Sequence, residues 1–270
     1  MEKIKSALVL SGGVALGLAH VGALKRLEKQ YQFDCLFGVS AGAIVSAGMA
    51  CGMNAKQIET AIKKTNLFDM AFDFSWKNTG LITGDAIRDS LNEIYGERTF
   101  EDLNVPLFIG ATDFSTGERV TLSEGNIAAA VRASLAVPVL FEPYFHKLSG
   151  RYLVDGGLTQ NFPIDLAMET YQGDKIIGID VANVKPVAED FHTDKFFGRN
   201  KDLVKNLQRT FRIFFQSQQQ FTPDERVEIF RPDLSDFSSS ALSHSTHLAI
   251  IEAGEKSLDS PLITHRLQSN

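Results

Sequence analysis

The chain has 270 residues, of which 44% are hydrophobic and 22% charged, and its formal net charge is −6 at pH 7. This length and hydrophobic content are sufficient for a large buried core. The acidic balance argues against a nucleic-acid-binding protein, which would usually carry a basic stripe. No apolar run approaches the ~20 residues that a membrane-spanning helix requires.

Cysteine and histidine usage does not indicate a metal site, and we expect no cofactor. Cys35 and Cys51 lie within apolar segments, and we expect free thiols in a reducing, cytoplasmic compartment. No spacing of Cys or His residues is typical of a metal site. Two lysines before the apolar run 7–10 give the N-terminus some likeness to a secretory signal. Glycines interrupt that run early, so we interpret it as a strand followed by a glycine loop and a helix.

The N-terminal part of the chain alternates between strand and helix patterns. Residues 4–10 predict a strand, and 18–30 predict a helix whose leucine and valine side chains recur at helical spacing. A short apolar strand is expected at 34–37. A helix rich in small residues is expected at 41–53.

The same alternation continues to the C-terminal end. Further helices are expected at 55–65, 85–95, 127–134, 164–170 and 245–258, and further strands at 107–112, 119–122, 152–154, 175–181 and 227–230. Continuous apolar strands separated by helices are typical of a mainly parallel sheet that is covered on both faces. We therefore predict a three-layer α/β/α fold and a single domain over 1–270. Its motif-bearing core would span about 6–182, with C-terminal strand and helices at about 200–262.

Three further segments have distinct compositions. Residues 187–200 are polar and irregular, which indicates a loop. Residues 202–220 predict an amphipathic helix with an apolar leucine and phenylalanine stripe and a basic side. Such a helix can lie on a membrane, but most amphipathic helices pack on a core, and we favour core packing. The aromatic segment 67–76 is the expected pocket rim or membrane-facing loop.

A Gly-x-Ser-x-Gly turn gives the first chemical signal. Gly38 and Gly42 flank Ser40, with a predicted strand before the turn and a predicted helix after it. That setting is the one in which a strained turn exposes a serine nucleophile. Ser40 would then lie at a helix N-terminus, where free N–H groups favour developing negative charge.

Ser40 needs a base, and Asp155 can serve in two arrangements. The first is a triad in the chain order Ser, Asp, His. Its histidine candidates are His244, His247 and His265. The second is a dyad in which Asp155 itself is the base. We favour the dyad because the serine turn follows only the second strand, and because Gly156 and Gly157 remove side chains beside the carboxylate.

Taken together, the motifs resemble those of bacterial patatin-like phospholipases. The matching pieces are Leu10-Ser11-Gly12-Gly13 through His20, Gly38 to Gly42, Ala111-Thr112-Asp113 with Thr116-Gly117, Arg132-Ala133-Ser134 with Pro138, Asp155-Gly156-Gly157, and Asn161-Phe162-Pro163. The resemblance covers about 6–182, with a weaker echo at 251–254. It implies a patatin-like fold, Ser40 as nucleophile, Asp155 as base and hydrolysis of fatty-acyl esters in lipids.

The glycine loop would supply backbone donors for the oxyanion. The expected donors are the N–H groups of Gly12, Gly13 and Val14. Two residues depart from the family pattern, because Val14 replaces a third glycine and Leu16 replaces a basic residue. Valine disfavours positive φ, so we expect a different loop path. These departures shift the expected substrate from phospholipids toward a neutral lipid, a lysolipid or a simple acyl ester.

Three functions follow as hypotheses. The leading one is a serine acyl hydrolase acting on lipid-like esters. The second is an acyltransferase that uses the same acyl-enzyme with an alcohol or thiol acceptor. The third is a non-catalytic lipid-binding module, motivated by Val14 and Leu16. The expected partners are a lipid or fatty-acyl ester and, peripherally, a membrane surface, but not nucleic acid.

Overall fold

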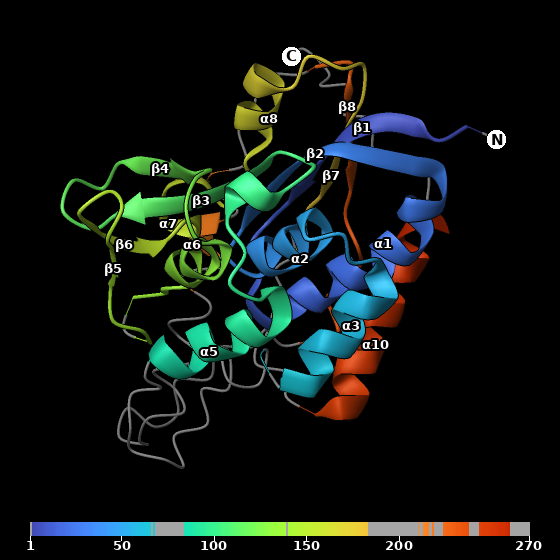
Figure 1. Cartoon of the computed structure of the whole chain (residues 1–270). Helices are drawn as coiled ribbons and strands as arrows, with labels where there is room; N and C mark the ends of the chain where they lie inside the picture. The colour runs from blue at the N-terminus through green and yellow to red at the C-terminus, as the bar shows by residue number, and fades with distance from the viewer. Residues whose placement is uncertain are drawn as a thin grey trace.

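The computed structural model describes most of the chain between residues 2 and 259 (Figure 1). The described residues are 2–65, 67, 84–138, 140–182, 210, 213–215, 218, 224–237 and 243–259. The loop predicted at 187–200 lies outside them. So do the aromatic segment 67–76, apart from Leu67, and most of the amphipathic helix predicted at 202–220. Among the described residues, no helix is long and apolar enough to cross a membrane.

Within the described residues, eight strands form one mixed sheet in the order β5-β6-β3-β2-β1-β7-β8, with β4 also paired to β3. Their bounds are β1 Ile4–Leu10, β2 Tyr31–Val39, β3 Leu107–Asp113, β4 Arg119–Leu122, β5 Tyr144–His146, β6 Arg151–Asp155, β7 Ile176–Ile179 and β8 Val227–Phe230. The strands β3, β2, β1, β7 and β8 are parallel, whereas β4, β5 and β6 pair antiparallel. The sheet predicted as mainly parallel therefore has an antiparallel end.

Helices cover both faces of this sheet, as the three-layer prediction requires (Figure 1). They are α1 Leu18–Gln30, α2 Ala41–Ala50, α3 Ala55–Thr65, α5 Gly84–Tyr95, α6 Ile127–Ser134, α7 Gly157–Gln160, α8 Ile164–Thr170 and α10 His244–Lys256, with 3-10 helices η1 Val14–Gly17, η2 Phe100–Asp102 and η3 Ser257–Asp259. In β1, Leu8 and Leu10 face a large core shared with α1, α2, α3, α5, α6 and α10. Ala7 and Val9 face a smaller core that is covered by α8. Because side chains alternate along a strand, one apolar run fills both cores.

Close helix packing fixes α10 against α1. A Cβ atom at Gly22 would lie 1.8 Å from the Ile251 carbonyl oxygen, and one at Gly254 would lie 2.0 Å from the Ala19 oxygen. Only glycine permits two backbones to approach so closely. The weaker match to the family pattern at 251–254 therefore lies in α10, which packs directly on α1.

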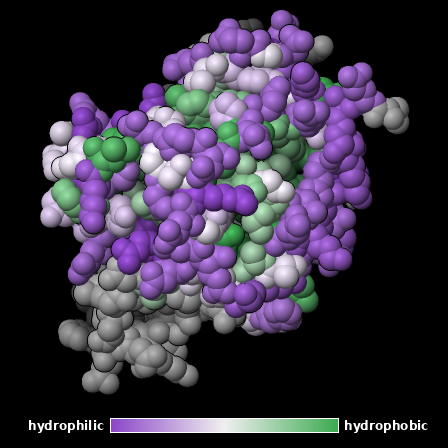
Figure 2. Space-filling model, in the orientation of Figure 1, coloured by the Kyte–Doolittle hydropathy of each residue, from purple (hydrophilic) through white to green (hydrophobic). Residues whose placement is uncertain are grey.

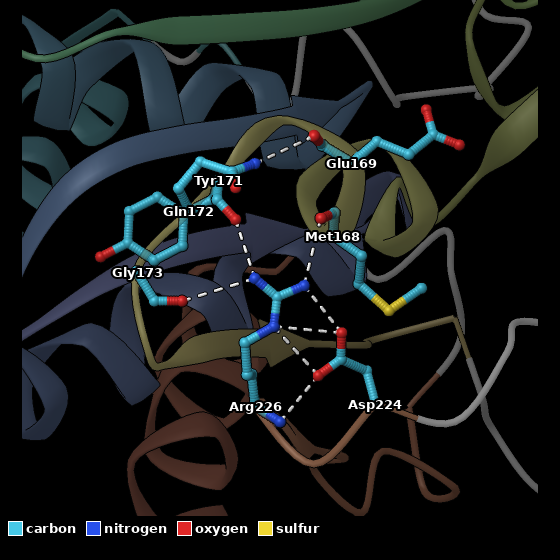
Figure 3. A network of polar contacts seen from close by, with 7 residues as sticks. All are labelled: Met168, Glu169, Tyr171, Gln172, Gly173, Asp224 and Arg226. Carbon is cyan, nitrogen blue, oxygen red and sulfur yellow. Dashed lines mark hydrogen bonds and ion pairs between the residues drawn. The ribbon is translucent and has the colours of Figure 1, made fainter.

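Arg226 joins the start of β8 to the end of α8 (Figure 3). Its guanidinium donates hydrogen bonds to the carbonyl oxygens of Met168 at 3.1 Å and Tyr171 at 2.9 Å. It also pairs with Asp224 through Nε and Nη2, the latter at 2.7 Å. These carbonyls belong to the last turn of α8 and the residue after it, where backbone acceptors lack helical partners. One side chain therefore satisfies a helix end and fixes an edge strand.

Candidate active site

The strand order brings the two predicted catalytic residues to one edge of the sheet. Ser40 follows β2, whose parallel neighbours are β1 and β3. Asp155 ends β6, which runs antiparallel to β3 and pairs with it at Ala111. Val39, the residue before Ser40, pairs with Gly110 in the β2–β3 ladder. Ser40 and Asp155 therefore lie at the same level of the sheet. Ligands of open α/β sheets commonly bind at this carboxyl edge.

Ser40 has a strained backbone in the turn before α2. Its φ is 52° and its ψ is −121°, and the residue is 4% exposed. The flanking glycines are required sterically. A Cβ atom at Gly38 would lie 2.2 Å from Ser46 Oγ, and one at Gly42 would lie 2.4 Å from the Leu10 carbonyl oxygen. The turn therefore has the geometry expected of a nucleophile elbow.

Ser134, in the last turn of α6, holds this turn from the side. The Ser40 N–H donates a 2.8 Å hydrogen bond to Ser134 Oγ. Ser134 Oγ in turn donates to the Gly110 carbonyl oxygen at 2.6 Å. The hydroxyl acts as donor and acceptor at once, so it ties the serine turn to β3. Sequence reasoning noted Ser134 only as part of a motif and gave it no role.

Asp155 is buried, and its backbone is held on both sides. Its N–H donates to the Ala136 oxygen at 2.9 Å, and its carbonyl accepts from Thr112 Oγ1 at 3.0 Å. Its Oδ1 accepts from the Gly157 N–H at 2.7 Å. A Cβ atom at the neighbouring Gly156 would lie 2.3 Å from the Gly110 oxygen, so the Asp-Gly-Gly segment packs directly on β3.

Burial raises the pKa of the Asp155 carboxyl to about 6, against the opposing effects of the Ser40 side chain and the Gly157 N–H. The Ser40 side chain is thus near enough to lower this pKa, although Asp155 Oδ2 completes no hydrogen bond within the described part of the chain. Catalytic hydrogen bonds are often loose before substrate binds. A carboxylate with a raised pKa and an available oxygen is suited to accept a proton.

The glycine loop leaves two of its three predicted donors available. The Gly12 N–H donates to the Asn161 carbonyl oxygen at 3.0 Å, so it is already engaged. Within the described residues, the N–H groups of Gly13 and Val14 donate to no protein acceptor. The set of candidate oxyanion donors therefore narrows to Gly13 and Val14.

The two departures from the family pattern are accommodated without disrupting the loop. Val14 has φ of 55°, in the left-handed region that valine disfavours. Because valine disfavours positive φ, a different loop path was expected. Val14 instead adopts the strained positive φ. Leu16 is 2% exposed and belongs to the large core. An apolar side chain thus fills buried space at the position where the family pattern has a cation.

Asn161 is a further polar residue of the site, and sequence reasoning assigned it no role. It is 2% exposed, and its Nδ2 donates to the Gly12 carbonyl oxygen at 3.2 Å. Its Oδ1 is buried and has no hydrogen-bond partner among the described residues. A Cβ atom at Gly12 would lie 2.3 Å from this oxygen and 3.2 Å from Ser40 Cβ. A Cβ atom at Gly157 would lie 2.9 Å from the same oxygen. Asn161 Oδ1 therefore lies between the loop, the serine and the aspartate segment.

The described histidines do not hydrogen-bond to Asp155. His20 is fully buried, its Nε2 lies 2.8 Å from the Ser11 carbonyl oxygen, and burial lowers its pKa to about 4. His244 is exposed and His247 half-buried at the start of α10. His265 lies outside the described residues. Among the described residues, no three His, Cys, Asp or Glu side chains are grouped as metal ligands would be.

Comparison with known proteins gives the family. The sequence profile of the patatin-like phospholipase family matches residues 8–168. The chain belongs to the patatin-like phospholipase family. This patatin-like chain is 31% identical over 183 residues to patatin-like phospholipase domain-containing protein 6 of Mus musculus, covering 66% of the chain and 13% of that protein. An uncharacterized NTE family protein of Mycobacterium tuberculosis is 33% identical over 162 residues, covering 58% of the chain and 44% of that protein.

The chain therefore spans less than half the length of these relatives. Among solved structures, VipD from Legionella pneumophila matches with a TM-score of 0.55 and 14% sequence identity, over 96% of this chain and 66% of that one. At this identity the likeness concerns the fold alone. It agrees with the three-layer α/β/α architecture of the patatin-like chain.

Proposed function

We propose that this patatin-like chain hydrolyses fatty-acyl esters of lipids through an acyl-enzyme on Ser40. The observation that supports the proposal most directly is the pairing of a strained serine with a buried aspartate. Ser40 has φ of 52°, and Asp155 has a raised pKa and an oxygen that has no hydrogen-bond partner among the described residues. Membership of the family supports the substrate class, and the site geometry supports the chemistry.

In the acylation step, Asp155 accepts the hydroxyl proton as Ser40 Oγ attacks the ester carbonyl carbon. The carbonyl electron pair moves to oxygen, and the N–H groups of Gly13 and Val14 stabilise the resulting oxyanion. The oxyanion then re-forms the carbonyl and expels the alcohol, which takes the proton from Asp155. In the second step water attacks the acyl-enzyme, Asp155 accepts a water proton, and the fatty acid is released as the proton returns to Ser40.

Two neighbouring side chains support these steps. Ser134 Oγ accepts from the Ser40 N–H and so helps to hold the backbone of the turn that carries Ser40 Oγ. Asn161 Nδ2 holds the Gly12 carbonyl, which sets the path of the loop that presents the oxyanion donors. Asn161 Oδ1 can only accept a hydrogen bond, and we propose that it accepts one from the attacking water in the acyl-enzyme. The measurable consequence is that Asn161→Leu should slow turnover more than it raises KM.

The decisive experiment labels the protein with a long-chain fluorophosphonate and records its intact mass. Wild type should gain one adduct, Ser40→Ala none, and Asp155→Asn should be labelled slowly. Ser6→Ala is the matched control, because Ser6 is also buried but lies in β1, and it should label like wild type. Folded wild type that takes no adduct would refute the hydrolase and favour a lipid-binding module. Product analysis with an added alcohol separates hydrolysis from acyl transfer.

A further inference from the structure

The proposed catalytic residues lie below the protein surface. Ser40 is 4% exposed, Asp155 3% and Asn161 2%. Outside its grey atoms, the face of the molecule in Figure 2 is mainly hydrophilic, so the polar groups of that surface meet water whereas these three side chains do not. Burial is also the main cause of the raised pKa of the Asp155 carboxyl. Some side chain of the structure must therefore exclude water from this carboxyl.

Phe215 is such a side chain, although it is distant from Asp155 in the sequence. Residues 213–215 are helical, and Phe215 is half-buried. A Cβ atom at Gly157 would lie 2.8 Å from Phe215 Cε1. The same Cβ atom would lie 2.9 Å from both Asp155 Oδ1 and Asn161 Oδ1. The edge of the ring and the two oxygens thus lie around a single point. An apolar ring in this place occupies space from which water would otherwise solvate both oxygens.

Gln218 holds the chain beside this ring on α7. Its Oε1 accepts from the Asn161 N–H at 3.0 Å, and its Nε2 donates to the Leu158 carbonyl oxygen at 3.1 Å. One side-chain amide therefore uses its acceptor and a donor on the segment that follows Asp155. Gln218 comes three residues after Phe215. Its two hydrogen bonds therefore restrain where the Phe215 ring can lie.

The inward contact is specific to Phe215 among its helical neighbours. Ile213 is 59% exposed and Phe214 is 39% exposed, whereas the edge of the Phe215 ring faces Gly157. All of these except Gly157 lie outside residues 8–168, the part of the chain that matches the family profile. Family membership therefore assigns them no role, and a role has to be argued from their contacts.

Charged side chains do not explain the raised pKa of Asp155 within the described part of the chain. The neighbouring elements α2, α7 and η1 contain no charged residue. Asp113 of β3 is paired with Arg151 of β6 at 3.4 Å, and the Arg132 guanidinium of α6 lies over two aromatic rings. The Asp155 pKa is instead raised by burial, against hydrogen bonding from its neighbours. It should therefore respond when a side chain that excludes water is removed.

We propose that Phe215 shields the Asp155 carboxyl and the Asn161 side chain from bulk water, and that Gln218 is the positioning residue that holds the ring in place. The inference rests on the proposed function, in which Asp155 accepts the Ser40 proton. Burial disfavours the charged form of a carboxylate, so a shielded carboxylate is a stronger base than one in water. Phe215 thereby sets the pH above which the dyad works, and Gln218 acts only through the ring.

The first test compares the pH profiles of wild type and Phe215→Ala. The readouts are the rate of fluorophosphonate labelling of Ser40 and kcat/KM for a soluble short-chain ester. Loss of the ring should move the acid limb from about pH 6 by about one unit toward the ordinary carboxyl value, because the base then stays ionised at lower pH. The rate at pH 5 relative to pH 8 should rise about fivefold. Phe215→Leu, which keeps an apolar side chain, should shift the limb less.

Two further variants separate the ring from its surroundings. Phe214→Ala is the matched control, because Phe214 is the adjacent phenylalanine and is 39% exposed, and it should keep the wild-type profile. Gln218→Ala should shift the acid limb in the same direction as Phe215→Ala. The double variant Phe215→Ala/Gln218→Ala should shift it no further than Phe215→Ala alone, since Gln218 acts through the ring. A further shift in the double variant would overturn the positioning role of Gln218.

A second readout needs no catalysis and so separates this inference from the proposed function. Asp155→Asn removes the buried charge, and at pH 8 it should raise Tm less in a Phe215→Ala background than in an otherwise wild-type chain. If wild type takes no label, the proposed function fails and this comparison of Tm still decides the shielding. An unshifted acid limb, equal Tm changes in both backgrounds, or an equal shift in Phe214→Ala overturns the shielding role. Phe215→Leu carries both comparisons if Phe215→Ala does not fold.

Discussion

Replacing Asp155 with asparagine should greatly reduce turnover and stabilise the protein. The carboxyl has an ordinary pKa of 3.8, and burial raises the pKa to about 6. Each pKa unit corresponds to ~1.4 kcal/mol, so the buried carboxylate costs roughly 3 kcal/mol of folding free energy. Asparagine keeps the oxygen that accepts from the Gly157 N–H and carries no charge. Turnover should fall by ~10²–10⁴ because the general base is lost.

The sign of this effect depends on pH. The folded pKa is raised above the unfolded one, so the folded state disfavours the ionised form. The cost is absent below about pH 3.8, develops between 3.8 and about 6, and is complete above about 6. The variant should therefore gain roughly 3 kcal/mol at pH 8 and about half of that at pH 5. At pH 8 this corresponds to a rise in Tm of about 6 °C for a chain of this size.

Thermal unfolding of wild type and Asp155→Asn at pH 5 and pH 8 measures the effect. The control is Asp113→Asn, because Asp113 is also buried but is paired with Arg151, and its loss should lower Tm. In wild type, kcat/KM should fall tenfold per pH unit below about 6, where Asp155 becomes protonated. A lower Tm for Asp155→Asn at pH 8, or an equal gain at both pH values, would refute the assignment of a desolvated carboxylate.

Three further predictions concern backbone strain, the loop and the β8 connection. Ser40→Gly should be about 1 kcal/mol more stable in urea unfolding than Ser40→Ala, because only glycine relieves the strain of φ 52°; equal stability would argue against strain. Leu16→Arg should lose at least ~3 kcal/mol because it buries an unpaired cation, while Leu16→Met should cost less than ~1.5 kcal/mol; a stable Arg variant contradicts the buried placement. Arg226→Lys should cost ~2 kcal/mol, since lysine cannot span the acceptors in Figure 3; an unchanged urea midpoint would refute this.

Elements with a strong periodic pattern could be predicted from the sequence. The helices at 18–30 and 55–65 and the strand at 4–10 have the predicted bounds. The helix at 127–134 also matches, and its start is fixed by Asn126, whose side chain accepts from Ala129 N at 2.8 Å. In each case the local apolar spacing agrees with the tertiary packing, and for the helix at 127–134 the capping agrees as well. The serine turn was predictable for the same reason, since the strand, turn and helix are contiguous in the chain.

Elements that depend on tertiary contacts were missed or misplaced. The strand β5 has only three residues, two of them outside the buried core, so it shows no apolar run. The helix α2 ends at Ala50 rather than 53, because Gly52 has φ of 85° and ends the helical path. The contact between Asn161 and Gly12 could not be predicted from the sequence, since it spans 149 residues.

The glycine loop shows how packing can replace a charge. Val14 holds a strained φ, and such strain persists only where the surroundings fix it. Here Asn161 holds Gly12 through both its carbonyl oxygen and its Nδ2. The Leu16 N–H then donates to the Gly13 oxygen at 3.1 Å, and the Leu16 side chain is buried in the large core. Burial and neutral hydrogen bonds, which fix this loop, are not weakened by salt screening as charge–charge interactions are. Acylation of Ser40 by a neutral ester should therefore be nearly independent of ionic strength.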